Sequence, residues 1–201
     1  MSRRSTVGIS VLLAVLGVGL HAGQALSKQD SESLVRKLVA IEARGAEPPV
    51  KGAKPVRTTF SEREVNAFFK YDGQSQLPTG VTDPQITIAD NGMVEAKAIV
   101  DLEAVRKAQP SMLLDLVAAM TSTVEVRATG RLQTTDGKGT LVLDRATVGG
   151  LPVPKSVLQS VITHYSKTPS SPEGFNLDKP FDLPAAIRTV ETQRGTAIIV
   201  Q

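Results

Sequence analysis

The chain has 201 residues, with 23 basic and 20 acidic side chains, no cysteine and no tryptophan. Without cysteine it can form no disulfide, thiol centre or lipid-modified cysteine anchor, and its nearly balanced, interspersed charges argue against a nucleic-acid partner. About 176 residues would remain after removal of an N-terminal leader, which is enough for one domain with a hydrophobic core.

The first 25 residues have the organisation of a secretory signal peptide. Arg3 and Arg4 form a positive region, an uncharged apolar run extends from Val7 to Leu20, and small residues precede the expected cleavage after Ala25. Cleavage after Ala22 is the alternative, and either site predicts a periplasmic or secreted protein. The apolar run is shorter than the roughly 20 residues that a spanning helix needs. An uncleaved membrane anchor and a twin-arginine signal are the competing interpretations.

Residues 26–55 predict one helix and a linker ahead of a single α+β domain at residues 56–201. The helix covers Asp30 to Arg44, and Gly45 is placed to cap its C-terminus. Its apolar side chains fall on one face: Leu34, Val35, Leu38 and Ile41. Glu47 to Pro55 contains three prolines and one glycine, which predicts a linker or surface loop.

A unit of an amphipathic helix, a Leu-Pro dipeptide and a β-hairpin occurs twice in the pattern, first from Ser61 to about Leu102. Ser61 and Glu64 have the spacing of a capping box, with Phe60 and Val65 placed as its hydrophobic staple. This helix is expected to end near Tyr71. The dipeptide Leu77-Pro78 and a hairpin turn at Asn91-Gly92 follow.

The second copy runs from Pro154 to Gln201, with a helix that ends near Lys167. The apolar residues of this helix are Val157, Leu158, Val161, Ile162 and Tyr165. Leu183-Pro184 and a hairpin turn near Arg194-Gly195 complete the unit. Two apolar helix faces and two hairpins have to cover or bind apolar material.

Further strands are predicted between the two copies. Apolar side chains alternate along Val94 to Leu102 and again along Val124 to Leu132, and Asp136-Gly137 predicts the next turn. The alternation changes phase within Leu141 to Val148, which indicates a β-bulge. Met112 to Met120 predicts a buried helix or a lid. The fold class is therefore α+β, with a curved, mostly antiparallel sheet packed on three to four helices.

Catalytic chemistry finds little support in the residues. His164 is the one histidine left after the leader, and the chain has no Gly-x-Ser-x-Gly motif, so we predict no enzyme, no metal and no cofactor. Asp136-Gly137-Lys138-Gly139 fits a turn better than a phosphate or calcium loop. Gly149-Gly150 could donate amides to an oxyanion, but it also terminates a strand. Four aspartates could pair as acid and base, yet solvated structural roles are simpler: Asp83, Asp90, Asp101 and Asp144.

The candidate binding site is the apolar face of the sheet together with one helix. Its residues are Ile86, Ile88, Val94, Ala96, Ala98, Val100, Val124, Val126, Ala128, Leu158 and Ile162. Ala96, Ala98 and Ala128 are small, so they leave room above the sheet. Either the helices of the protein fill that room, or an acyl chain or another elongated apolar ligand does.

Three motifs resemble a known family. They are Phe60 to Phe68, Gly150-Leu151-Pro152-Val153-Pro154 and Phe181-Asp182-Leu183-Pro184, in that order. Together they resemble the tubular lipid-binding (TULIP-like) superfamily and the domains of AsmA-like envelope proteins, over about Val56 to Gln201. The resemblance implies a curved sheet around a long helix, capture of an apolar ligand and no catalysis. The chain departs from it in having few aromatic or bulky residues to line a deep tube.

The leading hypothesis is an exported, non-enzymatic protein that binds a lipid or another apolar small molecule, with peripheral contact to a membrane or an envelope protein. The alternative is a structural or assembly scaffold of the cell envelope, with a filled core and no ligand. An esterase-like enzyme is a third hypothesis, but His164 would be its one available general base.

Overall fold

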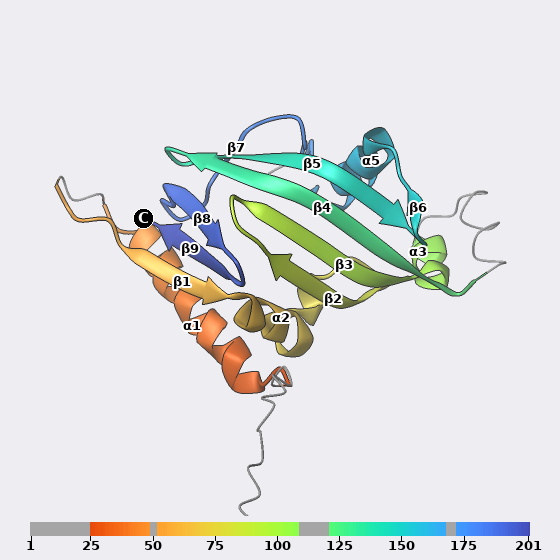
Figure 1. Cartoon of the computed structure of the whole chain (residues 1–201), viewed down its shortest axis with the longest axis horizontal. Helices are drawn as coiled ribbons and strands as arrows, with labels where there is room; N and C mark the ends of the chain where they lie inside the picture. The colour runs from red at the N-terminus through yellow and green to blue at the C-terminus, as the bar shows by residue number, and fades with distance from the viewer. Residues whose placement is uncertain (1–24, 49–51, 109–120, 168–171) are drawn as a thin grey trace, which may run out of the picture.

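Two antiparallel sheets and four α-helices make up the part of the chain that the structure, a computed structural model, describes (Figure 1). The described residues are 25–48, 52–108, 121–167 and 172–201. The predicted α+β class is confirmed, although the strands divide between a six-stranded and a three-stranded sheet. The predicted leader up to residue 24 and the apolar segment Met112 to Met120 lie outside the described residues.

The elements follow one another in the order that the pattern predicts, with several short additions. They are α1 (Lys28–Gly45), β1 (Arg57–Ser61), α2 (Glu62–Tyr71), a 3-10 helix η1 (Gln74–Gln76), β2 (Val81–Ile88), β3 (Met93–Asp101), α3 (Leu102–Ala108), β4 (Thr123–Thr135), β5 (Lys138–Val148), β6 (Leu151–Pro152), α5 (Lys155–Tyr165), β7 (Phe181–Asp182), β8 (Thr189–Gln193) and β9 (Thr196–Val200).

The six-stranded sheet has the order β2-β3-β4-β5-β6, with β7 paired to the start of β5. Its hairpin turns lie where the sequence predicts them. Asn91 and Asp136 adopt φ angles of 58° and 47°, and each is followed by a glycine with positive φ, as a tight hairpin turn requires. The predicted bulge is confirmed at Asp144. Thr129 pairs with Arg145 and Gly130 with Leu143, so Asp144 is the extra residue and the apolar side chains on both sides of it share one face.

The three-stranded sheet has the order β1-β9-β8 and contains the main hydrophobic core. The buried members of this core come from both helix and sheet: Leu34, Ile41, Phe60 and Ile199. Helix α1 therefore packs into the same core as β1 and β9, although a proline-rich segment separates it from them in the sequence. Because β1 pairs with β9, Arg57 lies opposite Val200.

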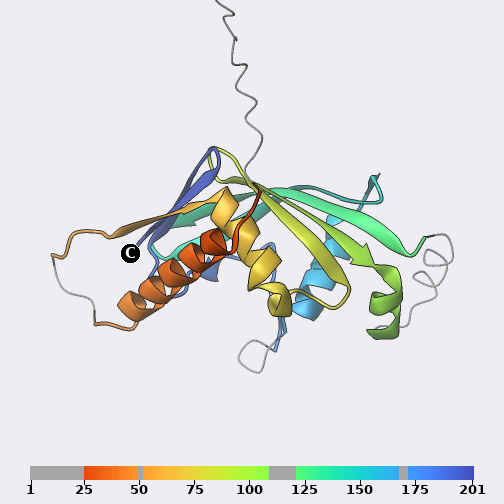
Figure 2. The same ribbon diagram turned by 90° about the horizontal axis from the view of Figure 1, so that it is seen from below.

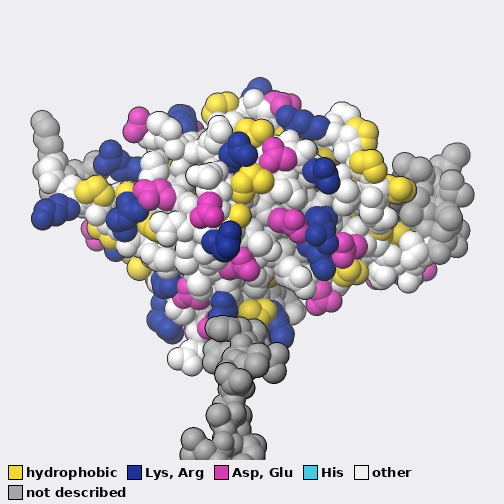
Figure 3. Space-filling model, viewed as in Figure 1, with side chains coloured by type: hydrophobic (Ala, Val, Ile, Leu, Met, Phe, Trp, Pro, Cys, Tyr) yellow, Lys and Arg dark blue, Asp and Glu magenta, His cyan; other side chains and the backbone are white. Residues whose placement is uncertain are grey.

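All four helices lie on one side of the sheets (Figure 2). The opposite side of the six-stranded sheet carries charged side chains of both signs (Figure 3). Two ion pairs there join neighbouring strands, Arg127 to Glu95 at 2.9 Å and Lys97 to Glu125 at 3.4 Å. We call the helix-covered side the inner side and the charged side the outer side.

Helix α2 closes the free edge of β2. Asn66 donates its amide to the Ile86 carbonyl at 2.8 Å, and its carbonyl oxygen accepts from the Ile86 amide at 2.7 Å. The Ile88 amide donates to Glu62 at 2.8 Å, and the Ile88 carbonyl accepts from the Gly195 amide at 2.8 Å. These bonds satisfy backbone groups that an open edge strand would present to another chain, and they fix α2 beside the sheet.

The predicted capping box at the start of α2 is confirmed. The Ser61 hydroxyl accepts from the Glu64 amide at 3.1 Å, and the Ser61 amide donates to the Glu64 carboxylate at 2.8 Å. Both copies of the helix-hairpin unit also have the predicted order of elements. Their hairpins differ in packing, because β2–β3 belongs to the six-stranded sheet and β8–β9 to the three-stranded one.

Two predictions about element ends are wrong. Gly45 is the last residue of α1 and does not cap it, since Ala46 occupies that position. Gly45 is required for another reason: a Cβ there would lie 2.4 Å from the carbonyl carbon of Ala185. Leu102 does not end a strand but begins α3, because the Asp101 carboxylate accepts from the Glu103 amide at 2.9 Å and caps the helix.

Candidate functional site

Strand pairing brings the predicted sheet residues together on the inner side. Ile86 lies opposite Ala96, and Ala96 lies opposite Ala128. The same face therefore holds all nine predicted sheet residues: Ile86, Ile88, Val94, Ala96, Ala98, Val100, Val124, Val126 and Ala128. On β4 and β5 the register adds five residues that the prediction did not include: Leu132, Leu141, Leu143, Ala146 and Val148. We call these fourteen residues the inner face.

The smallest side chains of the inner face lie in its middle. Ala96, Ala128 and Ala146 form one cross-strand row, and Gly130 lies in the next row. Larger side chains occupy both ends, with the valines near β6 and the leucines of β4 and β5 at the other end. We call this band of small side chains between larger ones the trough.

The helices pack on the margins of this face. Helix α2 contacts β2, α5 contacts β5, and α3 contacts the ends of β3 and β4. The predicted helix residues Leu158 and Ile162 are half-buried on α5, and this helix lies on the inner side of the sheet (Figure 2). Among the eleven predicted residues only Ile88 is fully buried, with 5 % exposure, and the others keep partial exposure. The trough is therefore apolar but incompletely covered.

The apolar surface reaches solvent at β6. Leu151 pairs with Val148, so its side chain continues the face that Val126 and Val148 define. Leu151 is nevertheless 72 % exposed. We call this solvent-exposed margin the open end of the inner face.

Aromatic side chains bound the opposite end, which the sequence analysis missed. A Cβ on Gly139 would lie 2.6 Å from the ring of Phe181, so this ring packs directly on the strand. Phe175 contacts Phe181 edge to face, with ring centroids 5.1 Å apart. Phe175 lies before β7 and Phe181 begins it, so two of the five phenylalanines of the chain fall close together in the sequence. This clustering was the signal for an aromatic contact.

Helix α5 holds this aromatic segment in place through polar side chains on one of its faces. The Gln159 carbonyl oxygen accepts from the Leu177 amide at 2.8 Å, and the Ser166 hydroxyl accepts from the Phe175 amide at 2.6 Å. Thr163 donates to the Phe175 carbonyl at 3.2 Å. Leu177 is only 2 % exposed. Because these bonds hold the backbone of the segment, α5 determines the position of Phe175.

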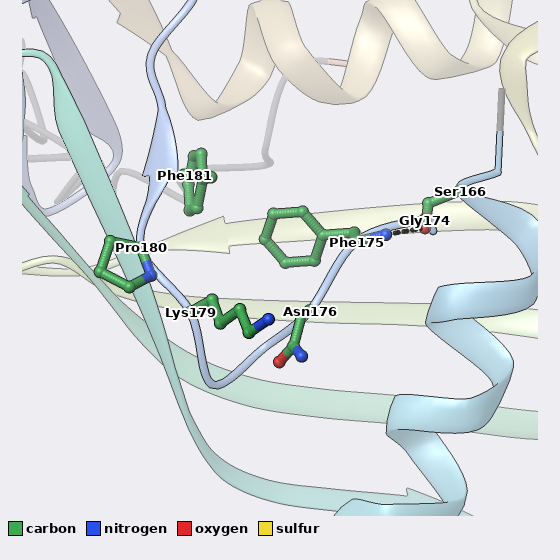
Figure 4. A pocket seen from close by; sticks show the side chains of 7 residues that line it. All are labelled: Ser166, Gly174, Phe175, Asn176, Lys179, Pro180 and Phe181. Carbon is green, nitrogen blue, oxygen red and sulfur yellow. Dashed lines mark hydrogen bonds between the residues drawn. The ribbon is translucent and has the colours of Figure 1, made fainter. Parts of the chain in front are cut away.

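A cavity of about 450 Å³ opens beside the two rings (Figure 4). Its lining consists of Ser166, Gly174, Phe175, Asn176, Lys179, Pro180 and Phe181. Figure 4 shows the Phe175 ring directed toward Phe181, with the polar ends of Asn176 and Lys179 beside it. A larger cavity of about 930 Å³ lies between α2 and β2, and neither cavity is lined by any of the eleven predicted residues.

Two of the four aspartates considered for acid–base chemistry occupy structural positions, and Asp83 and Asp144 are exposed. Asp90 accepts from the Arg194 amide at 3.1 Å, and Asp101 caps α3. The Gly149 amide donates to the Glu125 carbonyl at 2.8 Å and is thus engaged in the sheet. His164 is exposed on α5. Within the described ranges no three metal-ligating side chains gather.

The most strongly shifted buried acid lies outside the inner face, between α1 and α2. Desolvation opposes ionisation of Glu64, but hydrogen bonds from Lys37, Ser33 and Ser61 prevail and lower its pKa from 4.5 to about 2. The Lys37 ammonium lies 2.6 Å from the carboxylate and also donates to the Thr59 carbonyl. All these partners join α1 to β1 and α2, so the pair stabilises the core.

Comparison of the chain with protein-family models, curated proteins and solved structures finds no match. Among the described helices, none combines the length and the apolar character that crossing a membrane would require.

Proposed function

We propose that this chain is an exported, non-enzymatic protein that binds an elongated apolar ligand, such as an acyl chain, along the inner face. The observation that carries the proposal is a continuous apolar face whose residues, apart from Ile88 and Ala146, remain partly exposed. A scaffold with a filled core would bury such a face. The resemblance to tubular lipid-binding proteins agrees with the proposal but does not carry it.

The energetics suit a flexible apolar chain. Each methylene group that leaves water contributes about 0.8 kcal/mol. Roughly six methylene groups would then contribute about 5 kcal/mol, which offsets the lower range of the cost of association, about 4 kcal/mol. A trough that crosses several strands has room for more than this, because adjacent strands are about 4.8 Å apart.

Export is supported by the composition of the leader and by the position of α1. Ser27 and Asp30 form a capping box, in which the Ser27 amide donates to Asp30 at 3.0 Å. Cleavage after Ala25 or Ala22 would leave this box intact. Protein recovered from the extracytoplasmic fraction should begin at Leu26 or Gly23. An intact Met1 or Ser2 terminus in the membrane fraction would contradict export as a processed protein.

The experiment that tests the function is native mass spectrometry of the protein purified from the extracytoplasmic fraction, followed by solvent extraction. We expect a mass shift that corresponds to a bound amphiphile and recovery of that amphiphile in the extract. Protein that is always free of ligand, and that takes up no fatty acid when reloaded, would contradict the proposal and favour the envelope scaffold.

A further inference from the structure

We propose that the ligand is an anionic amphiphile and that the cavity beside β7 binds its charged head, a carboxylate or a phosphate. This inference rests on the proposed function, because it assigns one end of the same ligand. It follows from three features of the cavity: an uncompensated ammonium group, a free amide donor, and an aromatic wall that leads to the inner face.

The first feature is the charge of Lys179. The two carboxylates nearest to it in the sequence already pair with other lysines, Asp178 with Lys155 and Asp182 with Lys138. Lys179 itself forms no ion pair within the described part of the chain. Among the described residues that line the cavity, Lys179 is thus the one charged side chain, and an anion would neutralise it.

The second feature is the amide of Asn176. Its side-chain oxygen accepts from the Asp178 amide at 2.8 Å, which orients the side chain and leaves its nitrogen as the donor. Ser166 has no such freedom, because its hydroxyl donates to the Ile162 carbonyl and accepts from Phe175. Lys179 and the side-chain nitrogen of Asn176 thus offer donors to the cavity, and such donors suit an oxyanion.

The third feature is the path from the cavity to the inner face. Phe181 packs on Gly139, and Phe175 packs on Phe181. Leu141 and Leu143, the next residues of β5 on the same face, belong to the inner face. A volume of about 450 Å³ suits a head group with the first part of its chain. The remaining chain would lie over the rings and along the alanine row.

The size of the expected effect follows from the exposure of Lys179. An exposed ion pair contributes about 0.2–1 kcal/mol, so loss of the ammonium should weaken binding by at most about fivefold. The difference should shrink at high salt, because screening acts on exposed charges. The affinity for a neutral ligand of the same chain length should change neither on loss of the ammonium nor at high salt.

The test compares three ligands in a fluorescent-probe displacement assay: a long-chain fatty acid, the alcohol of the same length, and a lysophospholipid with a terminal phosphate. At low salt we expect the parent protein to bind both anions about two- to fivefold more tightly than the alcohol. In Lys179→Gln this preference should disappear while the affinity for the alcohol stays unchanged. Lys54→Gln, an exposed lysine before β1, serves as the control and should behave as the parent.

The outcomes separate this inference from the proposed function. Equal affinity for the anions and the alcohol, unchanged by Lys179→Gln, would overturn the head-group site and leave apolar binding intact. Failure of the parent to bind any of the three ligands would overturn both. A larger effect of Lys179→Gln on the lysophospholipid than on the fatty acid would support a phosphate head, and the reverse would support a carboxylate.

Discussion

The two sheets use their apolar residues differently. Around the three-stranded sheet, Leu34 and Ile41 are 4 % exposed, Phe60 is 8 % exposed and Ile199 is 7 % exposed, and α1 closes over them. On the six-stranded sheet the central residues, such as Ala98 and Ala128, remain partly exposed although they lie on an equally apolar face. One region is a closed core, and the other is an apolar surface that stays partly exposed.

This difference indicates where the stability of the fold originates. Each large side chain of the closed core leaves water almost completely, and burial of that kind contributes about 1.5–3 kcal/mol per residue. The inner face obtains less from folding because part of its surface still contacts solvent. A protein with a sufficient core elsewhere can leave such a face available for a ligand.

The largest expected effect comes from opening the closed core. Leu34→Ala should lower the free energy of unfolding by about 2–5 kcal/mol, because the substitution leaves an empty space among packed side chains. Val39→Ala on the same helix is the matched control, since Val39 is 59 % exposed and should change stability by no more than about 0.5 kcal/mol. Urea denaturation measures both. A similar, small loss for the two variants would show that α1 does not close the core.

The next effect concerns Glu64 and the three polar side chains around it, which we call the polar clamp. Glu64→Gln removes the charge that Lys37, Ser33 and Ser61 surround, and we expect a loss of about 1.5–3 kcal/mol at neutral pH. Lys37 is 32 % exposed in its side chain, which keeps the loss below that of a fully buried pair. Urea midpoints at pH 7 measure this loss, and an unchanged midpoint would mean that the clamp contributes nothing.

Because of the same carboxyl group, we expect the stability of the fold to depend on pH in the acidic range. The folded state lowers the pKa of Glu64 from 4.5 to about 2, so its contribution is fully present above the unfolded value and is lost as the pH falls through this interval. The pKa of Asp30 is lowered to about 2 as well, chiefly by its hydrogen bond from Arg63. The stability difference between the parent and Glu64→Gln should therefore shrink from pH 7 to pH 2. A difference that stays constant would contradict the assignment.

A smaller effect is expected at the start of α2. Ser61→Ala removes the helix cap and should cost about 1 kcal/mol. Ser160→Ala, inside α5, is the control, because alanine is a good helix former and the Ser160 hydroxyl donates only to the Ser156 carbonyl of its own helix. Thermal denaturation distinguishes the two. If both leave the midpoint unchanged, the Ser61 hydroxyl does not stabilise the helix.

The smallest effect on stability is expected at the open end of the inner face. Leu151→Ser should change the free energy of unfolding by no more than about 0.5 kcal/mol, because this residue is already 72 % exposed. Affinity for a long acyl chain should fall at the same time, since the margin of the face loses apolar contact. A destabilisation of more than about 1 kcal/mol would show that Leu151 belongs to a packed core.

The local pattern of the sequence predicts which residues share a face. Alternation along Val94 to Leu102 and along Val124 to Leu132 predicts which of these side chains share a face. The phase change within Leu141 to Val148 predicts a bulge, and the structure confirms it. Helix starts are equally local, as Ser61 and Glu64 show. These features depend on residues only a few positions apart.

Pairing between distant segments is not local and was not predicted. Nothing in the alternation of β1 indicates that Arg57 lies opposite Val200, so the division into two sheets could not be derived. The role of Gly45 depends on the approach of Ala185, which is 140 positions away. Phe175 was missed because its place beside Phe181 depends on side chains of α5.

Overpacking of the inner face, compared with the closed core, tests the central claim most directly. Ala98→Leu and Ala128→Leu each enlarge a partly exposed residue of the trough, whereas Ala67→Leu enlarges a residue of α2 that is 0 % exposed. Fluorescent fatty-acid uptake and urea denaturation are measured for the parent and all three variants. We expect Ala67→Leu to lose about 1–3 kcal/mol of stability. Ala98→Leu and Ala128→Leu should lose less than about 1 kcal/mol, yet bind the fatty acid about tenfold more weakly. No uptake by the parent, with all three variants destabilised alike, would contradict a ligand-binding inner face.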